Sequence, residues 1–155
     1  MDSYSDLFDK KLIFWNVEAK DRESLYFQIA QKLNNYGIVK DSYFNALSKR
    51  EDEFPTGLKT NFLPIALPHA NPENVNQAFI AVVKTLKNIP MKQMGTDEVM
   101  SVKNFFFLGI TSEEQDLQVK LLQRFMQLMN DQTFVNSFKM LEDPSDVYQF
   151  LVERF

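Results

Sequence analysis

His69 is the only histidine in this chain of 155 residues, and the chain contains no cysteine. A neutral imidazole is a nucleophile that can carry a phosphoryl group reversibly near neutral pH, because its ordinary pKa is about 6.5. A backbone carbonyl on the second ring nitrogen would fix the tautomer, and a rigid segment would fix the ring's direction. Pro68 provides such rigidity. The sequence Pro-His-Ala-Asn-Pro equally fits an ordinary solvated turn histidine, so both interpretations stay open here.

The composition excludes several classes of protein. Without cysteine there are no disulfides, thiolate nucleophiles or cysteine metal sites, and one histidine rules out a multi-histidine metal cluster. Only a carboxylate site for magnesium or calcium stays formally open. A net charge of −4 with mixed signs offers no basic stripe for nucleic acid. No apolar run spans a bilayer and the first residues do not resemble a signal peptide, so we expect a cytoplasmic protein.

The segments around His69 have the patterns of strands and helices. Apolar runs predict buried strands at residues 11–17, 65–67, 79–86 and 104–110, and Pro68 ends the second of these, which places His69 at a strand end. Residues 87–103 are expected to form a loop, with a short extended piece as an option. Apolar residues at helical spacing predict a helix at 22–36, which Gly37 ends, and a second helix that Asp41 caps and that holds Arg50. The same spacing predicts three further helices at 113–130, 132–141 and 144–155. Ser112 and Gln115 form a capping box for the third helix.

This order of elements predicts one domain over residues 1–155 with an α/β (α+β) fold. The simplest packing is a mixed β-sheet of about four to five strands flanked by helices. The residues Phe105, Phe106, Phe107, Phe125, Met126 and Met129 lie on predicted strands and a helix, where core packing explains them. Exposed apolar residues near His69, such as Leu67 or Phe54, would instead help to dock partner proteins.

Three motifs precede or include His69 in a fixed order: Arg50-Glu51, Pro55-Thr56-Gly57-Leu58 and Ile65-Ala66-Leu67-Pro68-His69. They resemble the signature of the fructose/mannitol-type IIA proteins of the bacterial sugar phosphotransferase system (PTS). In that family an Arg-Glu pair closes a helix, a Thr-Gly turn follows, and an apolar strand ends in Pro-His. The resemblance extends over nearly the whole chain. Residues 49–57 are most similar to the galactitol-specific IIA component, which also has phenylalanine and proline before the threonine.

The resemblance implies that His69 is the phosphorylated residue, through the ring nitrogen remote from the side-chain branch, and that Arg50 stabilises the phosphate. Arginine suits this role because its planar guanidinium stays charged and donates two hydrogen bonds to a phosphoryl group. A solvated arginine at a helix end, favoured by the helix dipole, is the alternative. Thr56 and Gly57 would bind the same phosphate through a hydroxyl and a backbone amide, with plain turn chemistry as their alternative.

The start of the predicted helix at 113–130 departs from many relatives. Many mannitol- and fructose-type members have a second histidine there, whereas this chain has Gln115 and Asp116. A carboxylate beside a phosphoryl group would repel it, and Gln115 also fits the capping box. Neither residue is therefore assigned to the site.

The resemblance implies a phosphotransferase that accepts a phosphoryl group from the phosphorylated general carrier protein HPr and passes it to the cysteine of a IIB component. It implies only peripheral association with the membrane IIC/IIB complex, and no metal or organic cofactor. A regulatory IIA-like protein, whose phosphorylation a partner senses without sugar transport, is the second hypothesis. A structural domain with a degenerate motif is the third.

Overall fold

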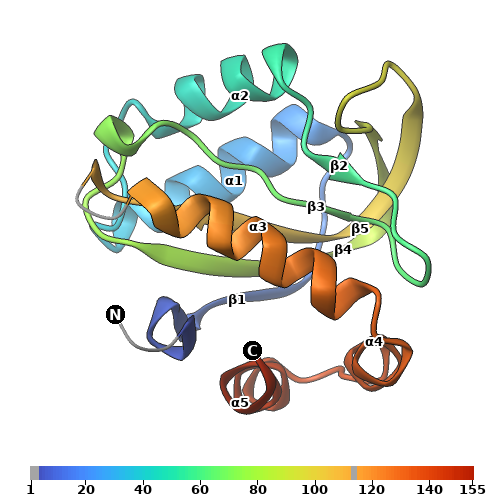
Figure 1. The fold of residues 1–155 in the computed structure, drawn as a ribbon. Coiled ribbons are helices and arrows are strands. Elements are labelled where there is room, and N and C mark those ends of the chain that lie inside the picture. The colour runs from blue at the N-terminus through green and yellow to red at the C-terminus, as the bar shows by residue number, and fades with distance from the viewer. Residues whose placement is uncertain (1–3, 113–114) are drawn as a thin grey trace.

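A five-stranded mixed β-sheet lies at the centre of the structure (Figure 1). The computed structural model describes residues 4–112 and 115–155, the side chain of Gln115 excepted. The sheet has the order β1-β4-β5-β3-β2, with β1 at Phe8–Val17, β2 at Gly57–Leu58, β3 at Ile65–Ala66, β4 at Phe79–Lys92 and β5 at Val99–Gly109. The pairs β1–β4 and β3–β5 are parallel, whereas β4–β5 and β2–β3 are antiparallel. The predicted α/β fold with a mixed sheet is confirmed.

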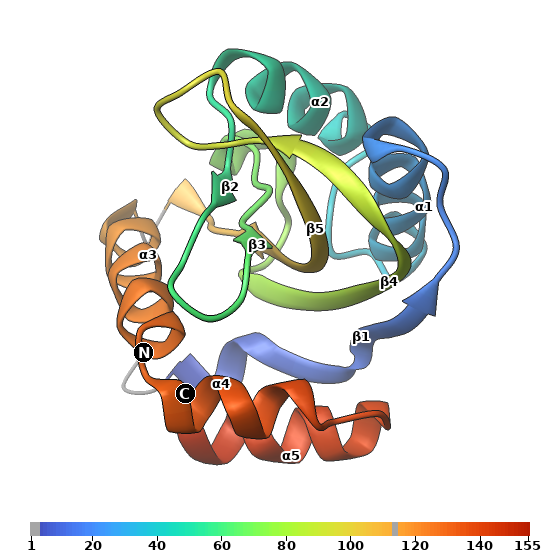
Figure 2. The ribbon, with the colours of Figure 1, turned by 90° about the vertical axis from the view of Figure 1, so that its right-hand side faces the viewer.

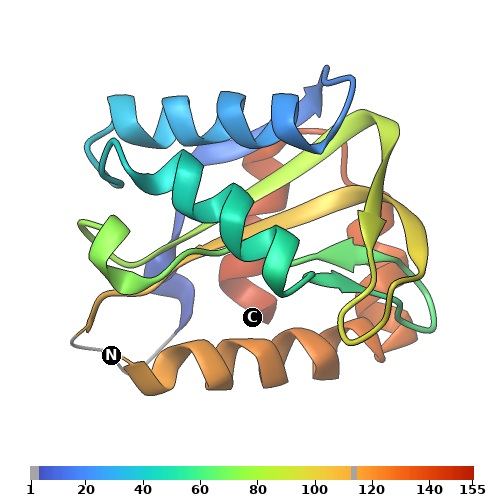
Figure 3. The same cartoon turned by 90° about the horizontal axis from the view of Figure 1, so that it is seen from above.

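Helices cover both faces of the sheet (Figure 3). One face carries α1 (Arg22–Asn35) and α2 (Tyr43–Glu53), and the other carries α3 (Gln115–Met129), α4 (Gln132–Lys139) and α5 (Pro144–Arg154). Short 3-10 helices lie at Tyr4–Leu7 and Pro72–Asn74. In the described part of the chain, no helix combines the length and the apolar character needed to cross a membrane.

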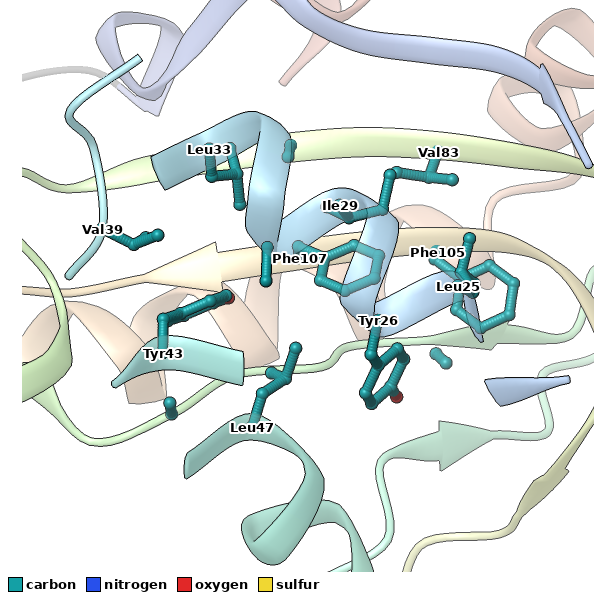
Figure 4. Packing of buried hydrophobic residues seen from close by; sticks show 14 of the residues in the cluster. Leu25, Tyr26, Ile29, Leu33, Val39, Tyr43, Leu47, Val83, Phe105 and Phe107 are labelled. Carbon is teal, nitrogen blue, oxygen red and sulfur yellow. The ribbon is translucent and has the colours of Figure 1, made fainter. Parts of the chain in front are cut away.

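The central strand β5 contributes to a separate core on each face. Phe105 and Phe107 pack with the apolar side chains of α1 and α2 (Figure 4), whereas Phe106 and Leu108 pack with α3, α4 and α5. This division follows from the two-residue repeat of a strand, which sends successive side chains to opposite faces. Met126 is the exception among the predicted core residues, since its side chain is 45% exposed on α3.

Residues 87–103 form a hairpin, so the loop predicted there is wrong. β4 continues to Lys92 and β5 begins at Val99, after a turn in which Gly95 has a φ of +78°. Ile89 pairs with Val102 beyond a register shift, and both side chains are buried. Charged and polar residues and a proline interrupt the apolar positions of this segment, and the long-range pairing that stabilises it is invisible in the local pattern.

The hairpin tip contacts the turn that precedes β3 (Figure 2). The amide of Met94 donates to the carbonyl of Gly57 at 2.7 Å, and Gly57 also forms a bridge with Gln93. A Cβ at position 57 would lie 2.5 Å from the carbonyl oxygen of Lys92. Glycine is therefore required here by the close approach of two backbones. Gly57–Leu58 is a short strand where the sequence predicted only a turn, because it pairs antiparallel with Ile65 and Ala66 of β3.

Other boundaries differ modestly from the predictions. β1 begins at Phe8, three residues early, and Gly37 follows α1 with a φ of +76°, as expected for a residue that ends a helix. The predicted cap by Asp41 is wrong: Ser42 is the N-cap of α2, and the Asp41 carboxylate accepts a hydrogen bond from Asn34 instead. The predicted capping box depends on the side chain of Gln115, which lies outside the described residues.

We predict that Gly57→Ala lowers the free energy of unfolding by about 1–3 kcal/mol, because the new methyl group forces β2 away from Lys92. Urea denaturation of both proteins measures this loss. Gly95→Asn is the control, since asparagine tolerates a positive φ and nothing lies within 4 Å of a Cβ there. An equal loss in the two variants would contradict the steric explanation.

Candidate active site

The backbone around His69 is held against β5. β3 pairs with β5 through Ile65 and Ala66, and the pairing continues past the end of β3. The amide of Leu108 donates to the carbonyl of Pro68 at 2.9 Å, and His69 forms a single bridge with Leu108. The histidine thus lies just beyond a strand end, as predicted, on a segment tied to the middle of the sheet.

Two hydrogen bonds define the tautomer of the His69 ring. Nδ1 lies 2.7 Å from the carbonyl oxygen of Leu67, which can only accept, so Nδ1 carries the proton. Nε2 lies 3.0 Å from Nη2 of Arg50, which can only donate. The neutral ring therefore has its lone pair on Nε2, the nitrogen remote from the side-chain branch. The carbonyl of Leu67 supplies the tautomer-fixing contact that nucleophilic chemistry requires.

The surroundings of His69 favour the neutral ring. Burial lowers the pKa of His69 below its ordinary value, the hydrogen bond to the Leu67 carbonyl opposes this shift, and the positive charge of Arg50 adds to it. Both lowering effects disfavour a second positive charge in a partly buried place beside a guanidinium. Nε2 therefore stays unprotonated and nucleophilic at neutral pH.

Arg50 lies in the last turn of α2 and is partly buried. Its guanidinium carbon sits 5.0 Å from the centre of the Phe54 ring, and Nη2 contacts His69. Its Nε is buried and has no hydrogen-bond partner among the described residues, where Arg50 also forms no ion pair with a carboxylate. Among the described residues no carboxylate thus offsets the charge of this guanidinium, whose Nη2 lies beside the nucleophilic nitrogen.

Thr56 and Gly57 are committed to the turn between α2 and β3. The amide and hydroxyl of Thr56 donate to the two carboxylate oxygens of Glu51 at 2.6 and 2.8 Å, and the Gly57 carbonyl accepts from Met94. Thr56 is only 2% exposed. Both donors of Thr56 are therefore used within the protein, which corresponds to the turn alternative. The predicted contact of Thr56 and Gly57 with a phosphate stays a prediction.

Sequence reasoning missed the contribution of Glu51. This residue was recognised only as half of the Arg50-Glu51 motif, yet its side chain is 3% exposed and accepts hydrogen bonds from Thr56 and from the Tyr26 hydroxyl. A glutamate in an amphipathic helix usually faces solvent, so nothing local distinguished it from Glu53. A signal was present only in the combination of an Arg-Glu pair with a threonine five residues later.

The residues considered for partner docking, Leu67 and Phe54, and the helix-start residue Asp116 differ in their exposure to solvent. Leu67 is 1% exposed, so its predicted docking role is wrong, because this end of the β3 segment points into the core of α3 to α5. Phe54 is 59% exposed, as expected for a docking residue. Asp116 is exposed on α3. In the described part of the chain, no cluster of three or more histidine, aspartate or glutamate side chains could hold a metal ion.

Comparison with known proteins places this fold and site in a family. Residues 6–154 match the family described as the EIIA 2 domain of the phosphoenolpyruvate-dependent sugar phosphotransferase system. The chain belongs to this family, as its motifs predicted.

Relatives differ in what surrounds the shared domain. The galactitol-specific EIIA component of Escherichia coli K12 is 28% identical over 107 residues, which is 69% of this chain and 70% of that protein. The fructose-specific EIIABC component of Mycoplasma pneumoniae is 26% identical over 137 residues, or 86% of this chain. The transcriptional regulator ManR of Bacillus subtilis is 31% identical over 140 residues, or 90% of this chain. The matched region spans only 19% and 20% of these two longer proteins.

Solved structures share the same fold. The nitrogen regulatory protein IIA-Ntr of Neisseria meningitidis superposes with a TM-score of 0.74 at 17% identity, covering 95% of this chain and 97% of that one. The IIA protein in the complex of enzyme IIAMTL with phosphorylated enzyme IIBMTL of Escherichia coli gives 0.73 at 18% identity, covering 96% and 100%.

We predict that His69 titrates with a pKa below about 6.5 and stays in the Nδ1–H tautomer, and that Arg50→Ala raises this pKa by removing a nearby positive charge and exposing the ring. Nitrogen-detected NMR of the imidazole measures both properties without ambiguity, because the chain has one histidine. A wild-type pKa above that of the variant would contradict the assigned electrostatics.

The lowered pKa of His69 also makes a prediction about stability. The unfolded chain binds the proton at a higher pH than the folded protein does, so acidification through about pH 6.5 favours unfolding. The difference in unfolding free energy between wild type and His69→Ala should therefore rise with pH in this window, with a slope of at most about 1.4 kcal/mol per pH unit. Urea denaturation at several pH values tests this, and a flat or falling difference would refute it.

Proposed function

We propose that this protein is a phosphocarrier IIA component of a PTS, with residues 1–155 acting as one IIA type-2 domain. His69 accepts a phosphoryl group on Nε2 from phosphorylated HPr and passes it to the cysteine of a IIB component. The observation that carries this proposal is the pair of contacts on the ring, which leaves Nε2 with the lone pair beside Arg50. Family membership supports it, as does the likeness to a IIA protein solved with a phosphorylated IIB partner.

The ring contacts suit transfer in both directions. In the first step the Nε2 lone pair forms a bond to phosphorus, the N–P bond of the carrier's phosphohistidine breaks, and its electron pair returns to the carrier's ring. The proton stays on Nδ1, so the phosphorylated ring carries a positive charge next to the Leu67 carbonyl. That charge makes His69 a good leaving group when a thiolate of the IIB component attacks phosphorus. His69 then returns to its neutral form.

Arg50 stabilises the phosphoryl group in this proposal. The guanidinium releases Nε2 as phosphorus approaches and donates to the phosphoryl oxygens instead, where charge develops in the transition state. The unpartnered Nε of Arg50 provides a further donor. No metal or organic cofactor takes part in these steps.

The proposal extends to the surface that docks partner proteins and to the sugar of the transport system. The exposed Phe54 ring packs on Arg50, so a partner that covers Phe54 also reaches the site. The similarity to a galactitol-specific EIIA component favours a sugar alcohol such as galactitol. We place the protein in the cytoplasm, where it meets the membrane IIC/IIB complex only peripherally.

A regulatory protein is the second candidate, favoured by one observation. The chain is 31% identical to a segment of the transcriptional regulator ManR. In that case a partner senses the phosphorylation of His69, and no IIB component accepts the phosphoryl group.

We predict that incubation with phosphoenolpyruvate, enzyme I and HPr adds one acid-labile phosphoryl group to the wild type and none to His69→Ala. Intact-mass spectrometry measures this gain. Arg50→Lys should accept the group about 10 to 100 times more slowly, because a point charge replaces a two-pronged donor. Addition of a IIB component then separates the two candidates, since only the transport phosphocarrier loses its phosphoryl group to the IIB cysteine.

The outcome depends on a charged donor. HPr phosphorylation is therefore measured in the same mass spectra. An unmodified wild type beside phosphorylated HPr would contradict the phosphocarrier function, and equal labelling of His69→Ala would place the phosphoryl group elsewhere.

A further inference from the structure

Glu51 is a buried carboxylate at the end of α2 with only neutral partners. It accepts hydrogen bonds from the Thr56 amide at 2.6 Å, the Thr56 hydroxyl at 2.8 Å and the Tyr26 hydroxyl at 2.8 Å. Within the described residues no lysine or arginine forms an ion pair with it. Removing a carboxylate from water costs free energy, and these three donors offset that cost. The placement therefore commits Glu51 to the Thr56 turn.

A chain of hydrogen bonds leads from Glu51 to the His69 imidazole and from there to Arg50, the residue before Glu51. Thr56, which Glu51 binds, accepts through its carbonyl from the amide of Leu67 at 3.2 Å. The Leu67 carbonyl accepts from Nδ1 of His69, and Nε2 of His69 accepts from Arg50. Arg50 directly precedes Glu51. These hydrogen bonds thus form a closed ring that links the end of α2, the turn, the β3 segment and the histidine.

Arg50 takes part in this closed set of contacts through His69 and not through a carboxylate. An arginine at an active site is commonly oriented by a carboxylate, but such a pair would offset the positive charge that a phosphoryl group needs. Here the adjacent carboxylate points to Thr56, and Arg50 is held by the backbone of α2, the Phe54 ring and His69. Glu51 therefore fixes the backbone that carries Arg50 and leaves the guanidinium charge free.

We propose that Glu51 is a positioning residue for the phosphoryl-transfer site. By binding Thr56 it keeps the end of α2 in register with the Leu67 backbone, so that both hydrogen bonds of the His69 ring are maintained together. The consequence for transfer rate rests on the function proposed above. The consequence for the pKa and tautomer of the His69 imidazole is independent of that function.

The experiment compares Glu51→Leu and Glu51→Gln with Glu53→Gln, the same chemical change on an exposed side chain two residues away. Tyr26→Phe is a second control, because it removes one donor to Glu51 and leaves the Thr56 contacts in place. NMR of the single histidine gives the pKa and tautomer of the ring. Rapid-quench labelling by phosphorylated HPr gives the rate, and circular dichroism confirms that each variant is folded.

For Glu51→Leu we expect the pKa of His69 to move toward its ordinary value, the Nδ1–H tautomer to lose population, and the transfer rate to fall about tenfold or more. Glu51→Gln should show a smaller change in the same direction, about threefold in rate. The glutamine oxygen can accept from the Thr56 amide, but its NH2 group then faces the Thr56 and Tyr26 hydroxyls, which must turn round and accept instead of donate. Glu53→Gln and Tyr26→Phe should leave the ring and the rate as in wild type.

A folded Glu51→Leu protein with unchanged ring properties and rate would overturn the proposal and leave Glu51 a purely structural residue. If Glu51→Leu does not fold, Glu51→Gln decides: behaviour equal to Glu53→Gln overturns the proposal. Failure of wild type to accept a phosphoryl group from HPr would contradict the proposed function instead. The pKa and tautomer measurements on the same variants would still decide the role of Glu51.

Discussion

The hydrogen bond between Nδ1 of His69 and the Leu67 carbonyl governs the chemistry available to this protein. It selects one of two tautomers, which leaves the lone pair on Nε2, and it holds the ring where Arg50 can reach it. The carbonyl is suited to this contact because Leu67 precedes a proline and lies outside the regular ladder of β3. A histidine with the same neighbours in sequence but no such carbonyl would lack a defined nucleophilic nitrogen.

The rest of the fold supplies the constraints that keep this contact in place. Pairing of Pro68 and His69 with Leu108 ties the loop to β5, a strand packed between two cores. The long β4–β5 hairpin returns at its tip to the Gly57 turn, next to the end of α2. The site thus lies where the end of α2, the His69 segment and the hairpin meet. Backbone hydrogen bonds tie the His69 segment and the hairpin tip in place, and the Glu51 side chain ties the end of α2 to the Thr56 turn.

Local pattern predicted the helices and the inner strands because their apolar repeats reflect burial directly. The hairpin at 87–103 escaped prediction because Pro90 separates its buried residues Ile89 and Met91, which disfavours a strand locally, and because these residues are stabilised by pairing with β5 after a register shift. The cap of α2 escaped for a similar reason. Asp41 has the chemistry of a cap, but its carboxylate has a tertiary partner in Asn34.

The sequence by itself determined the kind of chemistry: one histidine, no cysteine, and an ordered set of motifs that includes Arg50 and ends at His69. It also determined the fold class, because burial repeats are local. The resemblance of these motifs already implied the remote ring nitrogen and Arg50. Only the tertiary structure decided the contacts that leave Nε2 free, that bring Arg50 to it, and that bind Thr56 to Glu51 rather than leave it open. These are contacts between residues up to 19 positions apart. Their geometry depends on how α2, the turn and β3 are placed against the hairpin, which no local pattern encodes.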